Sequence, residues 1–183
     1  MIEVRALAEK AIDAQALMSG KDSLQRDGLR HRLAVRAAEE GDRLFLFRLY
    51  CSIREHDFIF LRDEERAAIL KMQFAAQNRH YEMEMPEVQS LIIILDGQPA
   101  GRLCIEQRPC ELHLAEISLL PEHRNQGIGS ILMEDLCAAG AGLNLPVRLY
   151  VGKHSLAVGF YLKRGFLPID DDAVHLLMER MPG

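Results

Sequence analysis

The chain has 183 residues, 49% of them hydrophobic and 27% charged, which predicts one domain with a packed core and excludes a disordered protein. Its formal net charge of −5 excludes a protein that coats nucleic acid, because such proteins need clustered lysine and arginine. No apolar run approaches the roughly 18 residues of a membrane span, and residues 1–20 lack the pattern of a signal peptide, so we expect a cytoplasmic protein with no membrane partner.

The first thirty residues are expected to stand apart from the main domain. Apolar residues from Val4 to Ile12 recur on one helical face, which predicts an amphipathic helix over residues 1–20 that packs on the main domain, docks a partner or completes a dimer. The next stretch, GKDSLQRDGLRHR, is polar and punctuated by glycine, which predicts a linker. We therefore divide the chain into residues 1–30, a helix with its linker, and residues 31–183, the compact domain.

The compact domain is predicted to alternate strands and helices. Its expected elements, in chain order, are a strand at 33–36, a helix after Asp42 as N-cap, a helix at 63–81, strands at 88–95, 100–106 and 111–120, a helix at 128–141, a strand at 147–151, a helix at 156–164, and strands at 166–169 and 174–178. The Asp-Gly pair of DGQP, between two apolar runs, predicts a hairpin. This order indicates an α/β sheet of mixed direction, with antiparallel hairpins early and a β-α-β crossover late.

A turn with two glycines, in LLPEHRNQGIGS, joins the strand at 111–120 to the helix at 128–141. Gly127 and Gly129 let the backbone approach an oxygen-rich ligand at a helix N-terminus, and Arg124 adds a guanidinium suited to phosphate. The alternative is a strand-to-helix turn that binds nothing. The turn is not a P-loop, because no lysine follows Gly129, and Leu132 stands where a dinucleotide fingerprint needs a small residue.

The spacing of Arg124, Gly127 and Gly129 resembles the R-x-x-G-x-G turn of the GNAT superfamily of acetyl-CoA-dependent N-acetyltransferases. The preceding ISLLPEHR resembles the family's fourth strand, and LYVGKHSLAVGFYLKRGF is similar to its last crossover. The crossover residues that carry this similarity are Ala157, Phe160, Tyr161, Gly165 and Phe166. The resemblance covers residues 33–179 and implies a mixed, mostly antiparallel central sheet that is splayed between strands 4 and 5 and flanked by helices.

The same resemblance implies that acetyl-CoA, as a cosubstrate, gives its acetyl group to a primary amine on a small molecule, peptide or protein by direct attack in a ternary complex. Backbone groups of residues 118–120 would line the pantetheine arm, and main-chain N–H groups of residues 125–130 would wrap the diphosphate. The implied cofactor-binding residues are Ser118, Leu119, Leu120, Arg124, Asn125, Gln126, Gly127, Ile128, Gly129, Ser130, Ser155 and Tyr161.

Two side chains are candidates for proton transfer. Tyr161 stands where the family places the tyrosine that protonates the departing thiolate, and the alternative is a core residue beside Phe160. The first candidate for the base that takes the proton of the amine is Glu116, with His113 and Glu111 as alternatives. Strand alternation puts Glu116 on the face opposite the other two unless a bulge intervenes.

One departure from the family concerns an Asn that often precedes the tyrosine by six or seven residues. His154 and Ser155 occupy these positions here. Ser155 can cap a helix, but it cannot offer the donor and acceptor pair of an amide. This departure motivates an alternative function, a non-catalytic acyl-CoA-binding sensor or interaction domain of the same fold.

Three further expectations concern the acceptor, metals and assembly. His80 and Tyr81 lie where the family lines its acceptor site, although a helix that buries Ile69, Met72 and Ala76 explains the segment equally well. The histidines and cysteines show no metal-ligand spacing, so we expect no metal and four cysteines that are buried in a reducing compartment. An exposed last strand edge and the N-terminal helix favour a homodimer.

Overall fold

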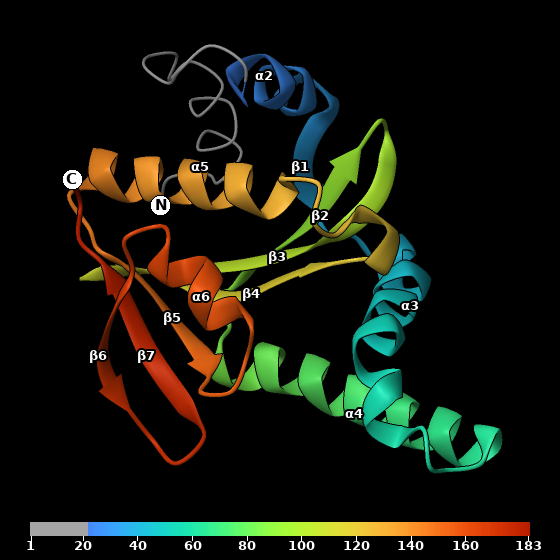
Figure 1. Ribbon diagram of the computed structural model, residues 1–183. Coiled ribbons are helices and arrows are strands. Elements are labelled where there is room, and N and C mark those ends of the chain that lie inside the picture. Colours follow the sequence, from blue (N-terminus) through green and yellow to red (C-terminus); the bar gives the residue numbers. More distant parts are fainter. Residues whose placement is uncertain (1–21) are drawn as a thin grey trace.

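The secondary structure follows the predicted order of strands and helices. The computed structural model describes residues 22–183, so the helix expected over residues 1–20 lies outside the described part. The helices and strands are α2 (Asp22–Arg32), β1 (Leu33–Ala37), α3 (Arg43–Arg54), α4 (Asp63–Glu84), β2 (Gln89–Leu95), β3 (Gln98–Arg108), β4 (Glu111–Leu119), α5 (Ile128–Leu143), β5 (Val147–Gly152), α6 (Ala157–Leu162), β6 (Leu167–Asp171) and β7 (His175–Arg180). Figure 1 shows their arrangement.

The strands form one sheet in the order β1-β2-β3-β4-β5-β7-β6. All neighbours are antiparallel except β4 and β5, which pair in parallel over three residue pairs that end at Leu114 and Leu149. Beyond that point β4 runs on to Leu119 without β5 beside it, and Figure 1 shows the two strands diverging. The predicted mixed sheet, splayed between its fourth and fifth strands, is confirmed.

Helices cover both faces of the sheet, with α5 along one face and α3 and α4 against the other (Figure 1). The face under α5 is apolar because inward residues alternate along β2, β3 and β4. Residues that form this core include Leu91, Ile93, Leu103, Ile105, Leu112 and Leu114 of the sheet and Ile128, Leu132 and Leu136 of α5. The opposite face carries more polar side chains, and there Phe74 of α4 packs against Phe47 and Tyr50 of α3 at ring-centroid distances of 5.4 and 5.6 Å.

The predicted hairpin between β2 and β3 is present. Its two central residues, Asp96 and Gly97, have φ of 51° and 77°. Positive φ at both central positions belongs to the type I′ turn, whose twist matches that of the flanking strands. Asp-Gly therefore determines this turn locally.

Two local expectations near the N-terminus are corrected. The stretch expected as a linker, residues 20–32, contains α2, whose Arg30 binds Asp135 of α5 and whose Leu29 packs against the core. Asp42 precedes α3, but its side chain does not cap that helix. Its carboxylate accepts hydrogen bonds from the Arg36 guanidinium, at 2.6 Å, and from the Glu39 N–H, at 2.9 Å. The division at residue 30 stays a prediction.

Only two of the four cysteines are buried. Cys104 and Cys137 are buried as expected, whereas Cys51 is half-buried and Cys110 is exposed in the turn between β3 and β4. The edge strand β6 is exposed along its whole length, and the homodimer stays a prediction. No helix among residues 22–183 is both long enough and apolar enough to cross a membrane.

Candidate active site

The glycine turn leads from β4 into α5 through two residues with positive φ. Asn125 has φ of 59°, and Gly127, the N-cap of α5, has φ of 89°. The first N–H groups of a helix have no carbonyl acceptor within the helix. The N–H groups of Ile128 and Gly129 can therefore donate hydrogen bonds to a bound anion. The Ser130 N–H differs, because it donates to the Gly127 carbonyl at 3.0 Å.

A cavity of about 340 Å³ opens at this turn. Its lining residues are Leu119, Arg124, Asn125, Gly127, Gly129, Ser130, Phe160 and Arg164. The first six were expected from the sequence, and the structure brings them together. The side chain of Gln126 instead donates to the Glu122 carbonyl at 2.6 Å, and that of Ile128 is buried in the core.

Sequence reasoning missed Phe160 and Arg164, which approach the cavity from α6 and the turn after it. The Arg164 guanidinium lies 3.6 Å from the centre of the Phe160 ring, donates to the Phe160 carbonyl at 2.8 Å and hydrogen-bonds Ser130 Oγ. With Arg124, it places two guanidinium groups at one cavity. The sequence feature that could have indicated Arg164 is the basic pair Lys163-Arg164 in YLKRGF, because a guanidinium close to the predicted site suits phosphate.

The open edge of β4 exposes fewer backbone groups than expected. The Leu120 N–H donates to the Ala100 carbonyl at 2.9 Å, so it points toward β3. Backbone groups alternate sides along a strand, so those of Ser118 also point toward β3 and those of Leu119 and Ile117 point into the gap. The Leu119 carbonyl already accepts a hydrogen bond from Arg124 Nε at 2.9 Å. The Leu119 N–H, together with Ile117, therefore defines the edge available to an extended ligand.

Tyr161 lies in the core and is not among the residues that line the cavity. It is 7% exposed and packs edge-on against Phe160 and Phe166, with ring centroids 5.3 and 5.7 Å apart. Burial raises the pKa of its phenol, so Tyr161 keeps its proton at neutral pH. Its neighbour Phe160 lines the cavity. Ser155 does not line it; it lies exposed before α6, and its Oγ accepts a hydrogen bond from the Ala157 N–H at 3.2 Å.

A bulge in β4 decides which face the three base candidates share. Glu116 pairs with Cys104 of β3, and the next pair is Leu114 with Ile105, so Ala115 is an extra residue without a partner. Paired residues of antiparallel strands point to the same face of the sheet. The β3 partners of Glu111, His113 and Glu116 are Arg108, Glu106 and Cys104, which are two residues apart and so share one face. Glu111, His113 and Glu116 therefore share the face under α3 and α4, which corrects the expected opposition.

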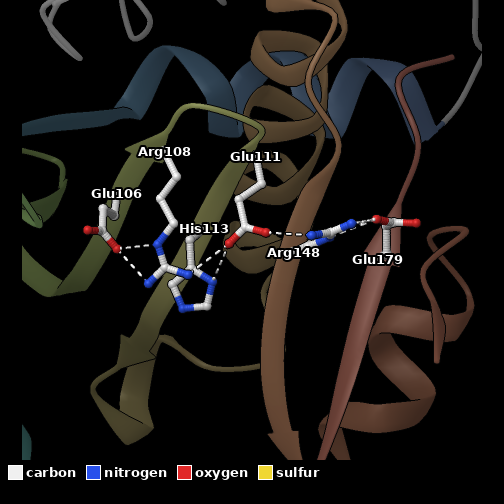
Figure 2. A network of polar contacts seen from close by, with 6 residues as sticks. All are labelled: Glu106, Arg108, Glu111, His113, Arg148 and Glu179. Carbon is white, nitrogen blue, oxygen red and sulfur yellow. Dashed lines mark hydrogen bonds and ion pairs between the residues drawn. The ribbon is translucent and has the colours of Figure 1, made fainter. Parts of the chain in front are cut away.

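Figure 2 shows why Glu111 is unsuited to accept a proton from a substrate. Its carboxylate is hydrogen-bonded by Arg108 at 2.8 Å and by Arg148 at 2.9 Å. Burial alone would raise the pKa of Glu111, but these two arginines outweigh it and hold the pKa below the ordinary value. His113 lies beside it, and burial lowers the pKa of its imidazole, whose Nδ1 is buried without a hydrogen-bond partner among the described residues. The network in Figure 2 thus joins β3, β4, β5 and β7 at the closed end of the gap.

Replacing Glu111 with glutamine is expected to lower the free energy of unfolding by about 2 kcal/mol at pH 7, because Arg108 and Arg148 each lose one of two charged partners and keep only Glu106 and Glu179. The value lies below that of a fully buried pair, since the side chains of Arg108 and Arg148 are 37% and 33% exposed. The folded-state pKa lies below the ordinary 4.5, so the contribution is present above that pH and is lost as pH falls through the folded-state pKa.

Urea unfolding at pH 7 and in acid measures this difference, which should shrink in acid. The control is Asp63→Asn, which removes the charged partner of Arg66. Because the Asp63 side chain is 90% exposed, this substitution should change the free energy of unfolding by less than about 0.5 kcal/mol. Equal stability of wild type and Glu111→Gln at pH 7 would contradict the stabilising role of the network.

Glu116 lies just beyond the last pair of β4 with β5. It is contacted by Ser118 Oγ at 2.8 Å, by Tyr81 Oη at 3.2 Å and by Arg102 Nη1 at 3.5 Å. Of the two acceptor candidates on α4, Tyr81 therefore faces the sheet, whereas His80 is exposed. The buried stripe of this helix contains Leu70 and Phe74, whereas Met72 and Ala76, expected to be buried, are exposed. Within residues 22–183, no group of three His, Cys, Asp or Glu side chains is arranged to hold a metal ion.

Comparison with known proteins gives a family and a set of similar folds. The model of the acetyltransferase (GNAT) family matches residues 47–166, which is more than half of the chain. The PaiA N-acetyltransferase of Thermoplasma acidophilum, solved in complex with coenzyme A, is 20% identical with a TM-score of 0.62, over 81% of this chain and 98% of that one.

Two further solved structures have the same fold. An acetyltransferase of Thermus thermophilus is 18% identical with a TM-score of 0.59, over 81% of this chain and 96% of its own. PH1933 of Pyrococcus horikoshii is 14% identical with a TM-score of 0.63, over 82% of this chain and 99% of its own. The family match and the splayed sheet with its glycine turn agree, and the chain belongs to the GNAT family of acetyltransferases.

Proposed function

We propose that the protein transfers an acetyl group from acetyl-CoA to a primary amine of a small molecule, peptide or protein by direct attack in a ternary complex. The observation that carries the proposal is the cavity at the turn before α5, which lies beside the open edge of β4. In the proposal the diphosphate binds the N–H groups of the turn and the guanidinium groups of Arg124 and Arg164. The pantetheine arm then follows β4 into the gap.

The reaction needs two proton transfers. The protonated amine gives one proton to Glu116, and the neutral amine attacks the thioester carbonyl. The Leu119 N–H stabilises the oxyanion, and losing one such donor costs about 3 kcal/mol in acyl transfer. As the tetrahedral intermediate collapses, Tyr161 donates its proton to the departing thiolate and regains one from the former amine. A phenol with a pKa near 10 can protonate a thiolate with a pKa near 8.5 only in a positioned, partly dry site, and the burial of Tyr161 supports this role.

The first test is calorimetric titration of the purified protein with acetyl-CoA, with NADH as the negative control. Micromolar binding of acetyl-CoA and none of NADH is the expected result. Free thiol release is then measured with a panel of primary amines that includes spermidine, lysine and a lysine-containing peptide. Failure of acetyl-CoA to bind would overturn the proposed donor.

A non-catalytic acyl-CoA sensor is the second candidate, favoured by Ser155 at the position of the usual Asn and by the hydrogen bonds that already occupy both oxygens of Glu116. Replacing Tyr161 with phenylalanine separates the two functions. We expect thiol release to fall about a hundredfold while calorimetric affinity for acetyl-CoA stays within about twofold, because only the proton donor is lost. The same basal rate of thiol release in wild type and variant, with every amine of the panel, would instead support the sensor.

A further inference from the structure

Both carboxylate oxygens of Glu116 are already engaged. Oε1 accepts a hydrogen bond from Ser118 Oγ at 2.8 Å, and Oε2 lies 3.2 Å from Tyr81 Oη and 3.5 Å from Arg102 Nη1. The side chain is 19% exposed. An amine that approached Glu116 directly would have to displace one of these donors, and the displaced group would lose a charge-assisted hydrogen bond.

The Tyr81 hydroxyl is held in place from two sides. Its ring lies 4.9 Å from the Arg102 guanidinium, which is itself fixed by a 3.0 Å hydrogen bond from Nε to Ser90 Oγ. The Arg102 side chain is only 7% exposed, so its positive charge is compensated mainly by the Glu116 carboxylate. Tyr81 stands in the last turn of α4, and its hydroxyl reaches β4 two residues beyond the last β4–β5 pair, where the gap begins.

In this geometry the Tyr81 oxygen can accept a hydrogen bond from a substrate amine. A phenol that donates its hydrogen to a carboxylate keeps lone pairs on its oxygen, and these accept a hydrogen bond from an N–H group. Burial and the neighbouring Glu116 raise the pKa of Tyr81, so the hydroxyl is neutral at physiological pH. Chains of such bonds strengthen one another in a partly dry site.

We propose that Tyr81 is a catalytic residue that contacts the acceptor amine and relays its proton to Glu116. The proposal rests on the acetyltransferase function proposed above. In the relay one N–H bond of the protonated amine breaks as its proton binds Tyr81 Oη. At the same time the original Oη–H bond breaks, and that proton binds Glu116 Oε2. Tyr81 ends as a neutral phenol, Glu116 as a neutral acid that returns its proton to solvent, and the amine as a neutral nucleophile.

The first experiment measures thiol release from acetyl-CoA with propylamine, a small primary amine without other polar groups. Tyr81→Phe is expected to lower kcat/KM at least tenfold without changing acetyl-CoA affinity. The matched control is Tyr50→Phe, which removes a hydroxyl of the same helical layer that donates to Gln73 of α4 at 3.2 Å. This control should retain the wild-type rate.

A double-mutant cycle separates a relay from a packing effect. If Tyr81 and Glu116 act in series, Tyr81→Phe with Glu116→Gln should be no slower than Glu116→Gln alone, because either change breaks the same path. Multiplied losses in the double variant, or an unchanged rate in Tyr81→Phe, would overturn the relay.

A second readout is independent of turnover. The chain has four tyrosines and no tryptophan, so carbon-13 labelling at tyrosine Cζ gives four signals, and Tyr81→Phe assigns one of them. Addition of propylamine to the coenzyme A complex is expected to shift the Tyr81 signal and to leave that of the exposed Tyr150 unchanged. An unmoved Tyr81 signal overturns the contact. If calorimetry shows acetyl-CoA binding and these tests fail, only the relay is wrong, whereas loss of acetyl-CoA binding refutes the proposed function itself.

Discussion

Replacing Gly127 with tryptophan is expected to weaken acetyl-CoA binding at least a hundredfold, or about 2.7 kcal/mol. Gly127 has φ of 89°, a conformation that costs an L residue about 1 to 2 kcal/mol. A Cβ at this position would lie 3.6 Å from Leu29 Cδ2 of α2, so an indole must displace either that side chain or the turn. Relaxation of the turn away from this strained conformation disturbs the N–H groups that the proposed diphosphate site requires.

Calorimetric titration with acetyl-CoA measures the loss, and thermal unfolding monitored by circular dichroism confirms that the variant is folded. The control is Gly142→Ala in α5, where an added Cβ would meet no atom within 4 Å. A folded Gly127→Trp protein with wild-type affinity would show that acetyl-CoA binds elsewhere.

Replacing Gly101 with alanine is expected to lower the free energy of unfolding by about 3 kcal/mol. An added Cβ would lie 2.2 Å from the Ser118 carbonyl oxygen and 2.8 Å from Leu119 Cδ2. The first of these atoms is backbone of the neighbouring strand, which cannot rotate away as a flexible side chain would. The strand must therefore shift, and acetyl-CoA affinity should fall as well, because Leu119 lines the cavity.

Urea unfolding tests this prediction against the same Gly142→Ala control. In that control a helical glycine becomes alanine without a clash, and stability should rise by up to about 1 kcal/mol. If Gly101→Ala is as stable as wild type, the close approach of β3 and β4 at this position is wrong.

The sequence alone predicted the features that depend on neighbouring residues. Asp96 and Gly97 specify a hairpin, because a two-residue turn of this type needs positive φ at both positions. Gly127 likewise specifies the turn before α5, and the apolar runs around it give β4 and α5. The splayed sheet and the family followed from the resemblance of these motifs and their order along the chain.

Residue choice within α4 shows where such reasoning failed. Apolar side chains are distributed around this helix, so periodicity did not distinguish the buried Leu70 and Phe74 from the exposed Met72 and Ala76. The polar segment before β1 was likewise taken for a linker, whereas Arg30 of α2 binds Asp135, 105 residues away. The polar composition of such a segment shows that it is exposed to solvent, but it does not reveal the distant residue that holds the segment in place.

Only the tertiary structure decided how the candidate site is assembled. The sequence determined that Glu116 lies on β4 and that the glycine turn follows this strand, because both facts depend only on the order of residues along the chain. The bulge at Ala115 arises from pairing with β3, and it alone turns Glu116 toward α4. The contact of Tyr81 with Glu116 spans 35 residues and that of Arg164 with Ser130 spans 34. Such contacts depend on how the sheet and helices pack, which no local pattern encodes.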